Sequence, residues 1–149
     1  MEVLVALVVM AVGMLGIAAL YVEGLRSGRT AIYRTSAISL AADMADRIRA
    51  NPVGKLDYAA NNRGGISTPA DICGSGVCDS TERAAQDWSD LQAAIGDRLP
   101  PGAEASISVV DEDPTNIRAL VQYTITIAWP ETGQDGMVDY SLSFQRQGQ

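Results

Sequence analysis

Few residues in this sequence could do chemistry, because the chain of 149 residues contains no histidine. Without an imidazole it has no histidine general base, no Ser-His-Asp or Cys-His catalytic set and no histidine-ligated zinc. Its two cysteines, Cys73 and Cys78, lie in Cys-Gly-Ser-Gly-Val-Cys, where two glycines let a short loop close. This pattern favours a disulfide over a metal site, and two free thiols in a cytosolic domain are the alternative.

A cluster of oxygen ligands occupies residues 111–116, Asp-Glu-Asp-Pro-Thr-Asn. Carboxylate and amide oxygens bind calcium in proteins. This segment lacks the glycine and the distal bidentate glutamate of an EF-hand loop, so we interpret it as an acidic hairpin loop and expect no metal. The other side chains form no catalytic set. We expect neither enzyme activity nor a cofactor.

The charge is unevenly divided along the chain. The net charge is −7, from 18 acidic and 11 basic residues, which gives no phosphate-neutralising surface and argues against a nucleic-acid partner. Residues 1–51 carry five bases and four acids, whereas residues 52–149 carry six bases and fourteen acids. A basic stalk and an acidic head would suit subunits that stack lengthwise, and a solvated surface with a juxtamembrane lipid contact explains the asymmetry equally well.

The longest uncharged stretch runs from Val3 to Val22 and is long enough to span about 30 Å of hydrocarbon as a helix. A cleaved signal peptide would be shorter and would follow a basic segment, whereas Glu2 precedes this stretch and Glu23 follows it. A buried core helix is the alternative, but the remaining chain is too small to enclose it. We predict a single membrane span.

Two signals disagree about the side of the membrane on which the rest of the chain lies. Arg26, Arg29 and Arg34 follow the span and no base precedes it, so the positive-inside rule alone places the rest in the cytoplasm. A disulfide between the two cysteines instead requires an oxidising compartment such as the periplasm. We therefore expect a further segment ahead of the N-terminus of this sequence.

Helical periodicity continues beyond the span. Residues 23–50 contain no proline, and apolar side chains recur there at three- and four-residue spacing. The apolar stripe consists of Tyr33, Ala37, Leu40, Ala41, Met44, Ala45 and Ile48. The charged residues that lie mostly off it are Arg34, Asp43, Asp46, Arg47 and Arg49. Asn51-Pro52 stops the helix, because the residue before proline is pushed out of the helical region, so we predict one helix over about residues 2–50.

The segment after this helix begins irregularly. Residues 53–78 are rich in Gly, Asn, Ser and Pro without a sustained period, which indicates a surface connection. Asp79 with Glu82 resembles a helix-start capping box. The apolar stripe that follows consists of Ala84, Trp88, Leu91 and Ile95. We predict a second amphipathic helix that ends at Leu99-Pro100-Pro101-Gly102, with Trp88 in the core.

The last third of the chain alternates between apolar and polar residues, as half-buried strands do. The apolar faces are Ala105, Ile107 and Val109; then Val121, Tyr123, Ile125, Ile127 and Trp129; then Val138, Tyr140, Leu142 and Phe144. Residues 130–136 have the composition of a hairpin turn. We predict an α+β fold in which the stripe on the long helix, including Leu40, Met44 and Ile48, packs on an antiparallel sheet.

These predictions divide the chain into three parts. Residues 1–22 form the membrane-spanning half of the long helix, residues 23–51 its amphipathic half, and residues 52–149 an α+β head. Glu2 stands at the start of the apolar span, where a carboxylate is costly unless it is paired or lies in the headgroups. From the residues alone, an interfacial carboxylate that favours the helix N-terminus explains Glu2.

Two segments carry a resemblance to a known family. The opening Met-Glu-Val-Leu-Val-Ala-Leu-Val-Val-Met-Ala-Val-Gly-Met-Leu-Gly resembles the N-terminal segment of type IV pilins, and the segment 43–52, Asp-Met-Ala-Asp-Arg-Ile-Arg-Ala-Asn-Pro, resembles the end of the long helix in PilV-type minor pilins. With Trp88, the Leu99–Gly102 turn and the strand from Tyr123 to Trp129, the resemblance extends over nearly the whole chain.

The resemblance implies a pilin-like fold and a role in assembly. The glutamate of the family, carried onto Glu2, would neutralise the N-terminal amine of an adjacent subunit, because opposite charges among apolar helices are tolerable only when paired. Such subunits prime the fibre with other minor pilins and the major pilin through their N-terminal helices, and they hold a tip adhesin. They occupy the inner membrane, with the head in the periplasm, and then the extracellular fibre.

The family also implies a longer precursor. A basic leader, a cleavage-site glycine and the first mature residues would precede Met1, and such a leader would hold the N-terminus inside and resolve the conflict over orientation. Two alternatives stay open. One is a pseudopilin of a type II secretion machine, which shares the architecture. The other is a binding domain anchored by a single span that never polymerises.

Overall fold

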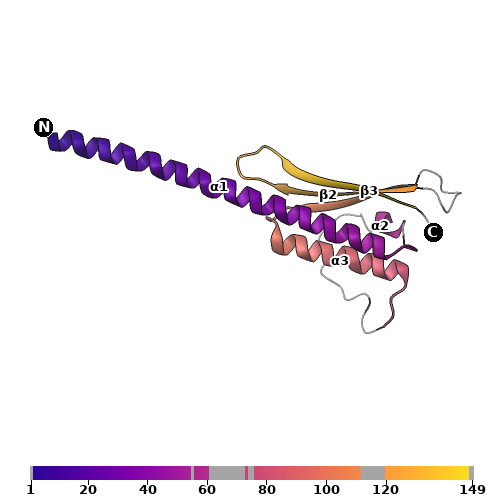
Figure 1. The fold of residues 1–149 in the computed structure, drawn as a ribbon. Coiled ribbons are helices and arrows are strands. Elements are labelled where there is room, and N and C mark those ends of the chain that lie inside the picture. Colours follow the sequence, from indigo (N-terminus) through magenta and orange to yellow (C-terminus); the bar gives the residue numbers. More distant parts are fainter. Residues whose placement is uncertain (1, 55, 61–72, 74–75, 112–119, 148–149) are drawn as a thin grey trace. The chain divides into compact units, whose positions relative to one another are not determined.

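The computed structural model describes residues 2–54, 56–60, 73, 76–111 and 120–147. Its elements are α1 (Glu2–Ala50), α2 (Asp57–Ala60), α3 (Ser80–Arg98), β1 (Glu104–Asp111), β2 (Leu120–Pro130) and β3 (Met137–Gln147) (Figure 1). The chain forms two compact units, Met1–Tyr33 and Arg34–Gln149, so that α1 contributes to both. We call the second unit the head.

The long helix α1 has the extent that the sequence predicts. Its described residues begin at Glu2, and it carries Arg47 and Arg49 in its last turn, where bases complement the partial negative charge of the helix C-terminus. Two donors bind the carbonyl oxygen of Ile48 near the C-terminus: the backbone N–H of Asn51 at 3.3 Å and Nη1 of Arg146 on β3 at 3.3 Å. These bonds satisfy a carbonyl that a helix end would otherwise leave unpaired.

The predicted capping box of the second helix is present. The Asp79 carboxylate accepts hydrogen bonds from the backbone N–H groups of Thr81 and Glu82, and the Glu82 side chain accepts from the backbone N–H of Asp79. Leu99 closes the other end of α3 through a backbone bond to Ile95, and proline follows. The predicted apolar stripe of Ala84, Trp88, Leu91 and Ile95 is buried.

The connection between the two long helices differs from the prediction. Within residues 53–78 the chain forms the short helix α2, Asp57–Ala60, so the expectation of an uninterrupted irregular segment is wrong at this point. A single helical turn is too short to show a 3.6-residue period, which is why the pattern did not reveal it. Residues 61–72 of the connection lie outside the described part of the chain.

The three strands form one antiparallel sheet in the order β1-β2-β3. Ile107 pairs with Ile125, and Ile125 pairs with Leu142, so the predicted apolar faces lie on the same side of the sheet. Gly133 and Gly136, in the turn between β2 and β3, have positive φ angles of 93° and 107°, which glycine adopts without strain.

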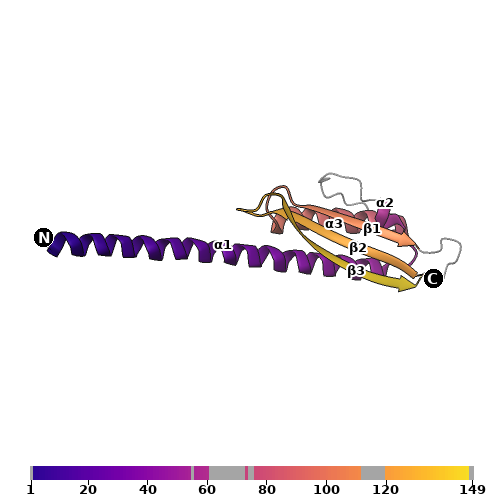
Figure 2. The ribbon, with the colours of Figure 1, turned by 90° about the horizontal axis from the view of Figure 1, so that it is seen from above.

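The head has two layers, as Figures 1 and 2 show. The second half of α1 and the helix α3 lie on one face of the sheet, and the apolar side chains of β2 are buried between helices and sheet. The opposite face of the sheet is polar. On it Thr124 bonds with Ser143, and Thr126 with Ser141, each at 2.9 Å between the hydroxyl oxygens.

Candidate assembly surface

The N-terminal unit presents an uninterrupted apolar surface. Every large apolar side chain from Val3 to Val22 is exposed, with exposed fractions between 49% and 75%. These side chains are Val3, Leu4, Val5, Leu7, Val8, Val9, Met10, Val12, Met14, Leu15, Ile17, Leu20, Tyr21 and Val22. We call residues 3–22 the apolar segment. So large an apolar surface needs lipid or other apolar helices around it, and α1 is long and apolar enough to cross a membrane.

Glu2 lies in the first turn of α1, immediately before the apolar segment, and is exposed. It is the only charged side chain in the sequence before Glu23. In a surrounding of apolar helices or lipid it would need a positive partner from outside its own helix.

The stripe on the second half of α1 is covered within the head. The three residues that the sequence assigns to helix–sheet packing, Leu40, Met44 and Ile48, are at most 3% exposed. Ala37, Ala41 and Ala45 are fully buried on the same face, and their small side chains let neighbouring elements approach α1 closely. The helix α1 therefore has an exposed apolar segment in its first half and an apolar stripe in its second half that is buried within the head.

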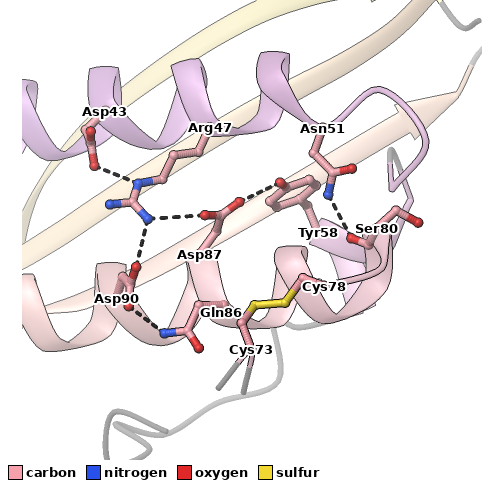
Figure 3. Close-up of polar contacts among 10 residues, drawn as sticks. All are labelled: Asp43, Arg47, Asn51, Tyr58, Cys73, Cys78, Ser80, Gln86, Asp87 and Asp90. Atoms are coloured by element: carbon pink, nitrogen blue, oxygen red, sulfur yellow. Dashed lines mark hydrogen bonds and ion pairs between the residues drawn. A yellow bond between two sulfur atoms is a disulfide. The ribbon is translucent and has the colours of Figure 1, made fainter. Parts of the chain in front are cut away.

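A polar network joins α1 to α3 (Figure 3). The guanidinium of Arg47 on α1 lies 3.0 Å from Asp43 on its own helix, and 3.1 and 2.8 Å from Asp87 and Asp90 on α3. Partial burial lowers the pKa of Arg47, but its hydrogen bonds to Asp90, Asp87 and Asp43 outweigh that effect and raise the pKa overall. The cation therefore stays charged between the two helices. Asp90 also accepts a hydrogen bond from Gln86 at 2.8 Å.

The short helix α2 joins the same network through Tyr58. The Tyr58 side chain is fully buried, and its hydroxyl donates a hydrogen bond of 2.8 Å to Oδ2 of Asp87. Burial, together with this bond, raises the pKa of Tyr58, because both favour the neutral phenol. Asp87 thus accepts from Arg47 with one oxygen and from Tyr58 with the other, which links α1, α2 and α3.

Asn51 fixes the end of α1 to the start of α3. Its Nδ2 donates to the carbonyl oxygen of Ser80 at 2.7 Å, and its Oδ1 accepts from the backbone N–H of Gly54 at 3.3 Å. A Cβ atom at Gly54 would lie 2.7 Å from Asn51 Nδ2 and 2.8 Å from the Ser80 oxygen, which is too close for a side chain. Glycine is therefore required where this turn contacts the first residue of α3.

Cys73 and Cys78 form a disulfide with 5.3 Å between their Cα atoms. The bridge ends one residue before Asp79, the N-cap of α3, and so ties the connection to the start of that helix (Figure 3). Val77, inside the loop that the disulfide closes, is fully exposed.

The acidic segment considered for calcium is described only at Asp111, at the end of β1, and residues 112–116 lie outside the described chain. Across the parts of the chain that the structure describes, no group of three or more His, Cys, Asp or Glu residues is arranged to hold a metal ion.

Sequence reasoning missed three residues of the network. No local pattern singles out Tyr58 or Asp87, because they bond to each other across 29 positions of sequence. Gly54 lies in a turn, which has no periodic pattern. Arg47 was identified only as part of the charged helix face. The sequence Asn51-Pro52-Val53-Gly54 was the available signal, since a polar residue followed by proline and glycine marks a defined turn.

Comparison with known proteins adds one match. Residues 19–89 match the model of a family named Tt1218-like and described as type IV pilin Tt1218. No curated protein and no solved structure matches the chain significantly. The matched segment includes every residue of the polar network except Asp90. Together with the long N-terminal helix and the three-stranded antiparallel sheet, it identifies a type IV pilin-like α+β fold.

Proposed function

We propose that this chain is a minor pilin of the PilV type, a structural subunit that helps to prime type IV pilus assembly. The match of residues 19–89 to a type IV pilin supports a structural role in a pilus. The observation that carries the proposal is the division of α1 into an apolar segment that the chain leaves exposed and a stripe that the head buries. Such an exposed segment can be covered first by the bilayer and then by the helices of neighbouring subunits.

In this proposal, residues 1–22 span the inner membrane before assembly and lie in the fibre core afterwards. Residues 23–51 carry the head, and residues 52–149 complete it in the periplasm. The disulfide between Cys73 and Cys78 supports this orientation, because disulfides persist in oxidising compartments. The partners are other minor pilins and the major pilin, through α1, and a tip adhesin. The role is structural and requires no catalysis.

Glu2 is the residue on which assembly depends in this proposal. When neighbouring helices surround the apolar segment, the carboxylate loses its contact with water and needs a positive partner. The N-terminal amine of an adjacent processed subunit would supply this charge. The pairing would fix the axial position of one helix against the next, since a displaced helix would leave two unpaired charges in apolar surroundings.

The experiment compares Glu2→Ala with Glu23→Ala, which removes the next carboxylate along the same helix. Both variants are expressed from the full-length gene, and the protein is quantified in sheared surface fibres and in the inner membrane. We expect Glu2→Ala to accumulate in the membrane and to fall at least tenfold in the fibre, whereas Glu23→Ala assembles normally. Normal fibre incorporation of Glu2→Ala would refute the pairing.

Mass spectrometry of the native N-terminus separates the proposal from its alternatives. In the fibre fraction we expect a trimmed, N-methylated start a few residues before Met1. A chain that is found only in the membrane with an unprocessed N-terminus would identify a single-span anchored domain. A third result would identify a type II secretion pseudopilin. In that case the chain is processed, and deletion of its gene abolishes protein secretion while pili persist.

A further inference from the structure

β3 is an edge strand whose outer side carries no neighbour among the described residues. The sheet order is β1-β2-β3, and all eleven residues of β3 pair with β2 in a continuous register without a bulge. In an antiparallel strand, alternate backbone N–H and C=O groups point away from the paired neighbour. The free edge of β3, visible in Figure 2, therefore presents a row of backbone donors and acceptors.

The two edges of the sheet differ. The helices α2 and α3 lie against β1, at the opposite edge. β3 also lacks most of the features by which proteins protect an edge, since it contains no proline and no lysine, and its only charged residues are Asp139 and Arg146. Arg146 donates a hydrogen bond to the carbonyl oxygen of Ile48, so its charge does not protect the edge of the sheet.

The core is also less complete at β3 than at β2. The inward side chains of β2 are at most 1% exposed, whereas those of β3 are all only half-buried. The half-buried apolar side chains are Val138, Tyr140, Leu142 and Phe144. Phe144 stacks on Tyr123 and lies beneath the guanidinium of Arg49, which covers only the end of this row. Apolar surface thus remains open at every second residue along the same edge.

We propose that the free edge of β3 accepts an additional β-strand from a different protein chain. The unpaired backbone groups require an extended segment, because only a strand satisfies alternate donors and acceptors at a regular spacing. The half-buried row requires that every second residue of this segment be apolar. The partner is therefore an extended segment that alternates between apolar and polar residues.

A second copy of this chain fits the edge less well. Two identical edge strands pair about a two-fold axis perpendicular to the sheet and therefore run in opposite directions. Within the head, residues 34–50 of α1 run along the strands (Figure 2), so this axis would also reverse residues 34–50. Two subunits anchored in one membrane share the same direction. This step rests on the proposed membrane anchoring, whereas the strand-addition test below does not.

The test uses the full chain in detergent micelles and a synthetic peptide with the sequence of residues 120–130. This peptide reproduces β2, the strand whose alternation already complements β3. Amide hydrogen exchange is measured with and without the peptide. We expect alternate amides of β3 to exchange at least about tenfold more slowly with the peptide, while those of β1 do not change. The same peptide with alternate amides methylated should give no protection, because it cannot donate these bonds.

Two protein variants locate the effect on the sheet. Ser141 on β3 and Ser106 on β1 are both exposed and both pair with Thr126 on the same face. We expect Ser141→Lys to weaken peptide binding at least tenfold and Ser106→Lys to leave it unchanged. Ser141→Lys also removes the bond between Ser141 and Thr126, so binding is compared at a temperature at which thermal melting shows both variants folded. Absence of binding, equal binding by the methylated peptide or greater sensitivity to Ser106→Lys would overturn the proposal. If the chain is a dimer and the amides of β3 are already protected from exchange without the peptide, the proposal is also overturned. The strand that pairs with β3 would then come from a second copy of this chain.

Discussion

Arg47 on α1 and Asp87 on α3, forty residues apart in sequence, meet at 3.1 Å between Nη1 and Oδ1. The Asp87 side chain is only 11% exposed and the Arg47 side chain 37%, so solvent screens the pair from one side. The other Asp87 oxygen accepts from Tyr58. Asp87 therefore links α1, α2 and α3 through side-chain bonds, beside the buried apolar stripe that also packs α1 into the head.

Replacement of Asp87 by alanine should destabilise the head. The variant leaves the buried hydroxyl of Tyr58 without its acceptor and removes one of the three carboxylates around Arg47. We expect the free energy of unfolding to fall by about 2 to 4 kcal/mol. Asp46→Ala is the control, because Asp46 forms an exposed pair with Arg49 and its loss should change stability by about 0.5 kcal/mol or less. Equal effects in chemical denaturation would contradict this role of Asp87.

The stability of the head should fall in alkaline solution. Burial and the bond to Asp87 raise the pKa of Tyr58, and burial raises that of Tyr123, so both phenols lose their protons later in the folded chain than in the unfolded chain. Their contribution to the free energy of unfolding is complete at pH values below the pKa of an unfolded tyrosine, about 10. It is lost as the pH rises towards the higher pKa values of the folded chain. Above pH of about 10, each group should lower the free energy of unfolding by about 1.4 kcal/mol per pH unit.

The variant Tyr58→Phe tests the first of these contributions. It should be about 1 kcal/mol less stable at neutral pH, because the hydrogen bond to Asp87 is lost, and its stability should decline less steeply above pH of about 10. Tyr123→Phe reports the second contribution separately. Denaturant unfolding at a series of pH values measures both slopes. An unchanged slope in Tyr58→Phe would show that Tyr58 does not cause the alkaline loss.

The sequence predicts the elements of this fold better than it predicts their connections. The extent of α1 follows from an uninterrupted apolar and amphipathic pattern that ends at Asn51-Pro52, and the start of α3 follows from the Asp79 and Glu82 capping box. The strands follow from strict alternation. Each of these signals is local, so a short window of sequence contains the physical cause.

The polar network has no such local cause. Arg47 appears in the sequence as one of several charges on a helix face, and only the fold shows that it faces Asp87 and Asp90 while Arg49 faces solvent and Phe144. Tyr58 is buried because the single turn of α2 packs against both α3 and β1. Contacts between residues 29 to 43 positions apart depend on packing, which periodicity does not encode.

A methyl group at Gly54 should strain the turn after α1. The added Cβ would lie 2.7 Å from Asn51 Nδ2, so the bond from Asn51 to Ser80 would have to lengthen or break. We expect Gly54→Ala to lower the free energy of unfolding by about 1 to 3 kcal/mol. Gly96→Ala is the matched control, because Gly96 lies exposed on α3 with open space around it, and alanine there should raise stability by up to about 1 kcal/mol. Thermal melting of the two variants should shift in opposite directions, and a shift in the same direction would contradict the close contact.

Reduction of the disulfide should weaken the head without unfolding it. Cys73 and Cys78 are five positions apart, so the bridge restricts only a short loop in the unfolded chain, and the chain-entropy estimate for such a loop is about 2 kcal/mol. The core and the Arg47 network do not depend on the bridge, because their residues lie on α1, α2, α3 and the sheet. We therefore expect a reducing agent to lower the unfolding midpoint in denaturant while the transition stays cooperative. The double variant Cys73→Ser with Cys78→Ser should unfold at the reduced midpoint with or without reductant. Loss of the cooperative transition on reduction would show instead that the disulfide is required for the fold.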